Sequence, residues 1–141
     1  MAIVRGFAAT SVFAGLAVGA AGAAWADTPT MNGSYNATST SPAGRAVVTS
    51  WTVSPCGDGC VYVKAGAGGG QARLVDGQWV LDGINDLMCP DGTYLQLATR
   101  SHMTWDPNTL VGTSQISYIY PACGQPAGYT QTNKLEIKQA S

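Results

Sequence analysis

The sequence predicts an all-β fold, an antiparallel sheet of roughly eight strands that closes on itself as an up-and-down barrel. Apolar and polar residues alternate with the period of two that half-buried strands show. Turn-forming pairs such as Asp76-Gly77 separate these runs at short intervals, and no helical period appears beyond the N-terminal segment. A two-sheet β-sandwich is the alternative. The barrel is favoured because closing the sheet removes exposed strand edges.

The stretch 51–63 predicts a β-hairpin around which the other strands are arranged. Trp51 and Val53 fall on the same face of its first strand because side chains alternate between faces. Pro55 cannot donate to a strand ladder, so we expect the first strand to end there. The turn residues 57–59 read Gly-Asp-Gly, which suits positive φ angles and local backbone hydrogen bonds.

The four cysteines predict two disulfides. Cys56 and Cys60 bracket the hairpin turn, and pairing them leaves Cys89 with Cys123. The second bridge would join the loops before and after the longest hairpin, which a regular hairpin places at the same end of the sheet. Zinc is disfavoured because a structural site needs four ligands, and beyond this pair the chain offers only the other two cysteines and His102. Paired cysteines also supply no thiolate nucleophile.

Residues 1–26 have the pattern of a cleaved export signal. Arg5 precedes an apolar run, and Ala-Trp-Ala ending at Ala26 fits the cleavage motif, with Asp27 as the first mature residue. A membrane anchor is the alternative, but the run is rich in Ala and Gly. We therefore expect a single secreted β domain over 27–141 with no membrane span after processing, located outside the cell or in the cell envelope.

The remaining elements follow from the alternation pattern. The odd-numbered residues of 93–105, including Leu95 and Leu97, are expected on one face. The glycine run 66–70 predicts a flexible loop, and 82–90 predicts an irregular segment. Joined by short hairpins, these strands predict a calycin-like barrel. Besides the two arms of the hairpin, strands are expected over 33–40, 71–75, 78–81, 93–105, 110–120 and 129–138.

Several chemistries are disfavoured. Ser101 and His102, the single histidine, are neighbours in a strand and point to opposite faces, so they cannot act as nucleophile and base. Glu136 is the only glutamate, which argues against paired catalytic carboxylates. The net charge of −1, without a cluster of Lys or Arg, makes nucleic acid a poor partner. We therefore expect no catalytic residues and no cofactor.

Calcium binding by the segment 82–91 is a further alternative. This segment holds oxygen ligands in Asp82, Asn85, Asp86 and Asp91. Their spacing is not that of an EF-hand loop, and aspartates also serve as turn residues. We therefore expect no metal site.

Three tryptophans are the candidate ligand-binding residues of the predicted barrel. Trp51, Trp79 and Trp105 would line either its packed core or a pocket for a small apolar ligand. Core packing is the more common role for such residues. A cavity of a few hundred Å³ between them would favour ligand binding.

Five short motifs are spread along the predicted mature chain. They are Trp51-Thr-Val-Ser-Pro-Cys-Gly-Asp-Gly-Cys60, Gly77-Gln-Trp79, Cys89-Pro-Asp-Gly92, Trp105-Asp-Pro-Asn-Thr-Leu-Val-Gly112 and Cys123-Gly124. These motifs resemble those of a group of small exported mycobacterial proteins. The resemblance implies secretion or an envelope location, and it implies no catalytic residue, since that family has no assigned activity.

The sequence thus favours a secreted or envelope-associated, non-enzymatic binding module of unknown ligand, with a small apolar compound or an envelope component as its partner. The second hypothesis is a structural or interaction protein of the cell envelope. It would act through surface aromatics, for which Tyr62, Tyr118 and Tyr120 are the candidates. A hydrolase is the third hypothesis, and no catalytic constellation supports it.

Overall fold

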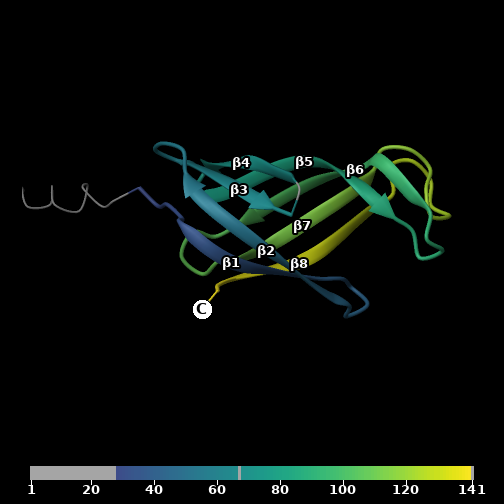
Figure 1. Cartoon of the computed structure of the whole chain (residues 1–141), viewed down its shortest axis with the longest axis horizontal. Coiled ribbons are helices and arrows are strands. Elements are labelled where there is room, and N and C mark those ends of the chain that lie inside the picture. The colour runs from purple at the N-terminus through teal and green to yellow at the C-terminus, as the bar shows by residue number, and fades with distance from the viewer. Residues whose placement is uncertain (1–27, 67, 141) are drawn as a thin grey trace, which may run out of the picture.

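The computed structural model describes residues 28–66 and 68–140, which form a closed antiparallel barrel of eight strands. Each strand pairs with the next along the chain, and β1 pairs with β8 to close the barrel (Figure 1). The up-and-down barrel is confirmed and the sandwich is excluded. The predicted signal segment and the Ala26–Asp27 cleavage site lie outside the described residues. The strands are β1 Gly33–Thr40, β2 Ala46–Pro55, β3 Cys60–Ala65, β4 Gly68–Val75, β5 Gln78–Met88, β6 Tyr94–Trp105, β7 Val111–Tyr118 and β8 Thr130–Gln139.

The two ends of the barrel differ. At one end, which we call the sealed end, lie the turns 56–59, 76–77 and 106–110, next to the first and last described residues (left in Figure 1). At the other, the open end, lie the turn 41–45 and the loops 89–93 and 119–129. The apolar core and the polar interior divide between these ends.

The apolar core fills the sealed end. Trp79 and Trp105 are completely buried there, and the ring of Trp51 lies 5.4 Å from that of Trp105 at an interplanar angle of 56°. Met31, from the segment before β1, closes this end, and its Sδ accepts a hydrogen bond from Trp105 Nε1 at 3.4 Å. The rest of the core consists of Tyr35, Ala37, Val53, Val61, Val63, Ala72, Leu135 and Ile137.

Both disulfides form as predicted. Cys56–Cys60 closes the β2–β3 turn, and Cys89–Cys123 joins the loop after β5 to the loop after β7. Two disulfides are compatible with an extracellular or envelope location. Within residues 28–66 and 68–140, no helix has the length and hydropathy needed to cross a membrane.

Two segments predicted as irregular are strands. Gly68–Gly70 open β4 instead of forming a flexible loop, and β5 continues through 82–88. Cross-strand pairing explains the first correction, because Lys64 and Ala65 of β3 lie opposite Gly69 and Gly68. Local turn composition is overridden where a neighbouring strand supplies a complete ladder.

A kink in β6 corrects the predicted face of Leu97. This residue has φ +49°, and its side chain is 61% exposed instead of facing inward with Leu95. The pairing register of β5 and β6 also shifts between Asn85 and Leu87. The Asp86 carboxylate at this bulge accepts hydrogen bonds from the Leu97 backbone N–H at 2.8 Å and from the Tyr94 hydroxyl. It therefore fastens the outer ends of the two strands together.

Acid should loosen this end of the barrel. The hydrogen bonds from Tyr94, and secondarily from the Leu97 backbone, lower the pKa of Asp86. Its contribution to stability is therefore present above the unfolded value of about 3.9 and is lost as the pH falls through the lower folded pKa. We expect Tyr94→Phe to raise the pKa of Asp86 in a carboxyl-carbon NMR titration.

Asp106 is the internal control for this titration. The backbone N–H groups of Thr109 and Asn108 lower its pKa, and it lies at the sealed end, so Tyr94→Phe should leave it unchanged. An unchanged Asp86 pKa in Tyr94→Phe would show that the tyrosine is not what holds the carboxylate ionised.

Candidate binding site

The barrel wall is incomplete on one side. β5 pairs with β6 from Trp79 to Met88, but β4 pairs with β5 only at Arg73, Leu74 and Val75. Pairing of β2 with β3 likewise reaches only to Trp51, although β2 starts five residues earlier. The β3–β4 hairpin therefore ends part-way along the barrel, while the β5–β6 hairpin runs on to the far end (Figure 1). Below the tip, 68–71 of β4 lie opposite 82–85 of β5 without ladder pairing. We call this unpaired seam, together with the gap between the hairpin tip and 46–50 of β2, the notch.

Backbone groups line the notch without strand partners. Leu74 N–H points toward β3, where it donates to the Gly59 carbonyl at 3.0 Å. Successive residues of a strand direct their N–H and C=O groups to opposite sides, so Gly69 and Gln71 direct theirs toward β5. By the same alternation Asp82 and Ile84 direct theirs toward β4. In the described part of the chain, no cross-strand pair joins these two edges.

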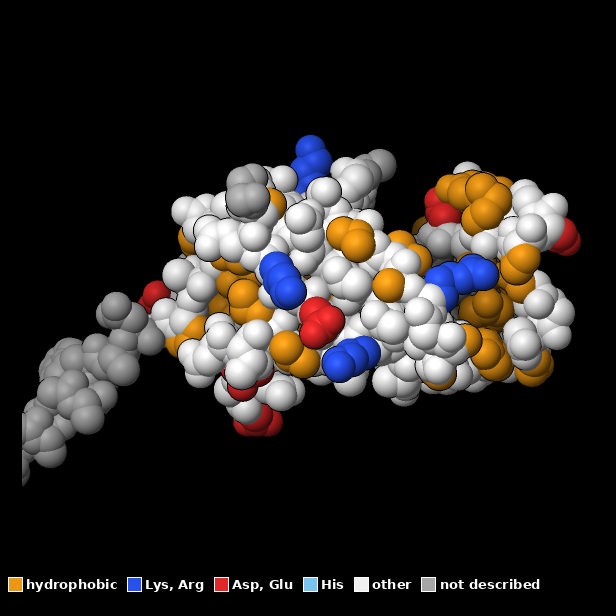
Figure 2. Space-filling view, turned by 90° about the horizontal axis from the view of Figure 1, so that it is seen from below, with side chains coloured by type: hydrophobic (Ala, Val, Ile, Leu, Met, Phe, Trp, Pro, Cys, Tyr) orange, Lys and Arg blue, Asp and Glu red, His pale blue; other side chains and the backbone are white. Residues whose placement is uncertain are grey.

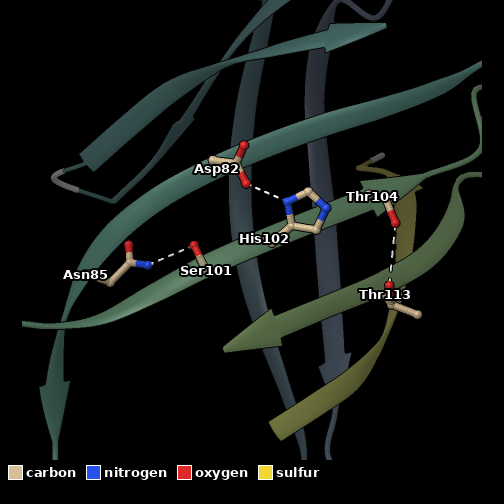
Figure 3. A network of polar contacts seen from close by, with 6 residues as sticks. All are labelled: Asp82, Asn85, Ser101, His102, Thr104 and Thr113. Atoms are coloured by element: carbon tan, nitrogen blue, oxygen red, sulfur yellow. Dashed lines mark hydrogen bonds and ion pairs between the residues drawn. The ribbon is translucent and has the colours of Figure 1, made fainter. Parts of the chain in front are cut away.

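A cavity of about 240 Å³ opens at the base of the notch. Its apolar wall comes from Trp51, Val63, Leu81 and Met103. Asn85 and Ser101 border it on β5 and β6, where Asn85 Nδ2 donates to Ser101 Oγ at 3.0 Å (Figure 3). Thr99 Oγ1 donates to the Asn85 carbonyl at 3.2 Å. The remaining lining residues are Ala65, Gly68, Gly69, Gly70, Asp82, Gly83 and Ile84.

Packing explains why one of the lining residues, Gly69, is a glycine, but it does not explain another, Gly83. At Gly69 a Cβ would lie 2.6 Å from the Tyr62 hydroxyl and 2.8 Å from the Val63 carbonyl, so packing requires glycine. At Gly83 a Cβ would meet only Ser101 Oγ, at 3.5 Å, which is an ordinary contact. Packing therefore does not require glycine at 83. A strand glycine of this kind often marks close approach of a ligand or of another backbone.

The structure separates the three candidate tryptophans. Trp51 lines the cavity, whereas Trp79 and Trp105 lie in the sealed core and are absent from the cavity wall. Sequence reasoning missed Gly83 and Met103. For Gly83 the available signal was a glycine within 82–90, a stretch that the sequence predicted to be irregular and that is part of β5.

His102 faces the outside of the barrel. Its Nδ1 lies 2.5 Å from Asp82 Oδ1, and both side chains are exposed (Figure 3). Ser101 points inward, to the opposite face from His102, as the strand alternation predicted. It is buried and accepts a hydrogen bond from Asn85. On the outer face, Thr104 and Thr113 lie opposite each other, with their hydroxyls 3.4 Å apart. His102 thus contacts a carboxylate and is separated by the strand from the adjacent serine.

Metal ligands do not gather in the part of the chain that the structure describes. There, no three His, Cys, Asp or Glu side chains lie close enough to hold an ion. The carboxylates considered for calcium have other partners. Asp82 contacts His102, Asp86 binds the β6 kink, and Asp91 accepts the Thr93 backbone N–H at 2.9 Å.

The candidate surface aromatics differ in exposure. Tyr62 is exposed, Tyr118 packs edge-on against Tyr129 with ring centroids 5.2 Å apart, and Tyr120 donates its hydroxyl to the Gln96 carbonyl at 2.7 Å. Other hydrophobic side chains gather at the open end of the barrel (right in Figure 2). The exposed ones in this half of the molecule are Val47, Val48, Ile84, Met88, Tyr94, Leu97 and Ile119.

Fold and site together define a disulfide-linked, eight-stranded antiparallel barrel with a notch in its wall and a cavity at the base of the notch. Comparison of the chain with known protein families, curated proteins and solved structures gave no match. The functional argument therefore starts from the geometry of the cavity.

Proposed function

We propose that this protein is an exported, non-enzymatic binding module that takes an apolar group of its ligand into the cavity beside Trp51. The observation that carries the proposal is the cavity of about 240 Å³, with an apolar wall and a polar border, open through the notch. Pockets for drug-sized ligands measure about 300–1,000 Å³, so this cavity suits a smaller, compact group. Trp51, Leu81 and Met103 supply the apolar contacts.

Export is supported by two independent features. The first residues have the signal pattern, and the two disulfides are typical of oxidising compartments. The resemblance to small exported mycobacterial proteins agrees with both. N-terminal sequencing of protein recovered from the culture medium should begin at Asp27.

Methionine methyl groups provide a direct binding assay. Met103 lines the cavity, Met31 lies in the core at the sealed end, and Met88 is exposed near the end of β5. With ¹³C-methyl methionine labelling and benzyl alcohol as the probe, we expect a saturable NMR shift at Met103. The Met31 and Met88 methyl signals should not shift, because neither residue lines the cavity. Met31 lies in the core, and Met88 is exposed on the surface.

Gly83→Val is the variant that we expect to lose binding. Its side chain would occupy the cavity, so the Met103 shift with benzyl alcohol should be lost. Gly83→Ala should stabilise the fold by about 0.4–1 kcal/mol, because alanine restricts the unfolded chain and fits here without strain. Thr113→Val, on the outer face of β7, should keep the shift. A probe that shifts all three methionines, or none, would contradict the proposal.

An envelope interaction protein is the second candidate. The exposed apolar side chains of the open end favour it, because monomeric proteins seldom leave large contiguous apolar patches uncovered. Cell fractionation followed by pull-down with Leu97→Asp as the control would test it. If the Leu97→Asp variant were retained in the envelope fraction as well as the parent protein is, the exposed apolar surface of the open end would not be the interaction site.

A further inference from the structure

We propose that the ligand of the cavity is a compact, uncharged hydrophobic alcohol, whose hydroxyl group bonds to Ser101 and Asn85 while its hydrocarbon part packs against Trp51. This inference rests on the proposed function, because it requires that the cavity take up an apolar group. It adds the chemical class of the ligand and the two residues that recognise its polar group.

The Ser101 hydroxyl brings a hydrogen-bond donor to the cavity. Its oxygen accepts the bond from Asn85 Nδ2 at 3.0 Å, and its proton is donated to no group within residues 28–66 and 68–140. Ser101 lines the cavity and is only 6% exposed. A buried donor without an acceptor is costly. The occupant of the cavity must therefore supply an acceptor or leave this hydroxyl unpaired.

The Asn85 side chain brings an acceptor to the same place. Its amide nitrogen is directed at Ser101, and its backbone carbonyl accepts the Thr99 hydroxyl at 3.2 Å (Figure 3). Among the described residues, no donor reaches Asn85 Oδ1. A hydroxyl group can accept one hydrogen bond and donate another. It therefore satisfies Ser101 and Asn85 together, whereas an ether or a ketone satisfies only the serine.

Gly83 leaves space in front of the Ser101 hydroxyl. Apart from its chain neighbours, a Cβ at Gly83 would meet only Ser101 Oγ, at 3.5 Å, within a distance of 4 Å. The usual separation of two oxygens in a hydrogen bond is about 2.7–2.8 Å. A ligand oxygen placed slightly closer to Ser101 than this Cβ would therefore bond to it without meeting the barrel wall.

The interior of the barrel changes from apolar to polar along β5 and β6. From the sealed end toward the open end, the facing pairs are Trp79 with Trp105, Leu81 with Met103, Gly83 with Ser101, and Asn85 with Thr99. The second pair belongs to the apolar wall of the cavity, and the third brings in the serine hydroxyl. A ligand with a hydrocarbon part at one end and a hydroxyl at the other matches this order.

The cavity disfavours a charged ligand. Among the described residues that line it there is no Lys or Arg to pair with a carboxylate or phosphate. Asp82 is the acidic residue of the lining, and its carboxylate contacts His102 on the outside of the barrel (Figure 3). Burying an ionised group without a partner is far more costly than burying a hydroxyl that finds its hydrogen bonds.

The test compares two probes, benzyl alcohol and ethylbenzene, which differ by a hydroxyl in place of a methyl group. Both should shift the Met103 signal of the methionine-labelled protein. Ser101→Ala should weaken benzyl alcohol by about tenfold and should not weaken ethylbenzene, because only the alcohol loses a hydrogen bond. Comparing each probe with itself across the two proteins cancels their difference in hydrophobicity. Asn85→Leu should act in the same sense as Ser101→Ala.

Ser114→Ala is the matched control. This serine lies on the neighbouring strand β7, is 2% exposed and does not line the cavity, so its loss should leave both probes unchanged. An unchanged Met31 signal shows that each variant keeps the fold of the core. Benzoate tests the charge, and we expect it to bind more than tenfold more weakly than benzyl alcohol.

The outcomes separate the two proposals. If Ser101→Ala weakens both probes equally, or weakens neither, recognition of the hydroxyl is wrong. If benzoate binds as tightly as benzyl alcohol, the preference for an uncharged ligand is wrong. In each of these cases the proposed function stands, because the cavity still takes up the aromatic ring. If neither probe shifts Met103 in the parent protein, both proposals fail.

Discussion

Gly112→Ala should be the most damaging single substitution in the barrel. A Cβ at this position would lie 1.8 Å from the Thr104 carbonyl oxygen and 2.6 Å from Trp105 Cα. Both contacts are with backbone, so no side-chain rotation can relieve them. Gly112 is opposite Trp105 on β6 and Leu135 on β8, two of the most buried core residues. We expect a loss of about 3 kcal/mol or more, since β6 and β7 must separate.

Urea unfolding followed by tryptophan fluorescence measures this loss. Gly83→Ala is the matched control, because it makes the same chemical change in a strand where the added methyl group has room. If Gly112→Ala unfolded with a free-energy change within about 0.5 kcal/mol of the parent, the close approach of β6 and β7 would be wrong.

Removal of the Cys89–Cys123 disulfide should have the second largest effect. The cysteines are 34 residues apart, and in the chain-entropy model a loop of this size contributes about 4 kcal/mol. The Cys56–Cys60 bridge spans a separation of 4 and contributes about 2 kcal/mol. Paired Cys→Ala variants of each bridge should therefore differ in unfolding free energy by about 2 kcal/mol. A larger loss for Cys56–Cys60 would contradict the loop-length argument.

The alternation of apolar and polar side chains in the sequence predicted most of the fold. Leu135 and Ile137, which alternate with charged residues in the strand expected over 129–138, are buried. Asp76-Gly77 was expected to turn a hairpin and has φ angles of +50° and +82°. The cysteine spacing likewise predicted both disulfides. These features depend on residues close in sequence, or on elimination among four cysteines, so they require no knowledge of the strand register.

The site could not be predicted in the same way, because it depends on unequal strand lengths. The notch exists because β4 pairs with β5 only at 73–75 and because β3 stops before β2 does, and no local pattern near Gly68 or Gly83 encodes either feature. The Asp82–His102 contact and the Asp86 bond to Leu97 likewise depend on the β5–β6 register. Of the three candidate tryptophans only Trp51 lines the cavity, and the sequence contained nothing to separate it from Trp79 and Trp105.

Amide hydrogen exchange across the β4–β5 seam tests the central claim, an open notch with free strand edges, most directly. In the free protein the N–H groups of Gly69, Gln71, Asp82 and Ile84 should exchange rapidly, while those of Ala72 and Gly83, which point toward paired neighbours, should be protected. This alternation between adjacent residues is the expected result. Uniform protection of both edges would mean that β4 and β5 pair along their whole length and that the notch does not exist.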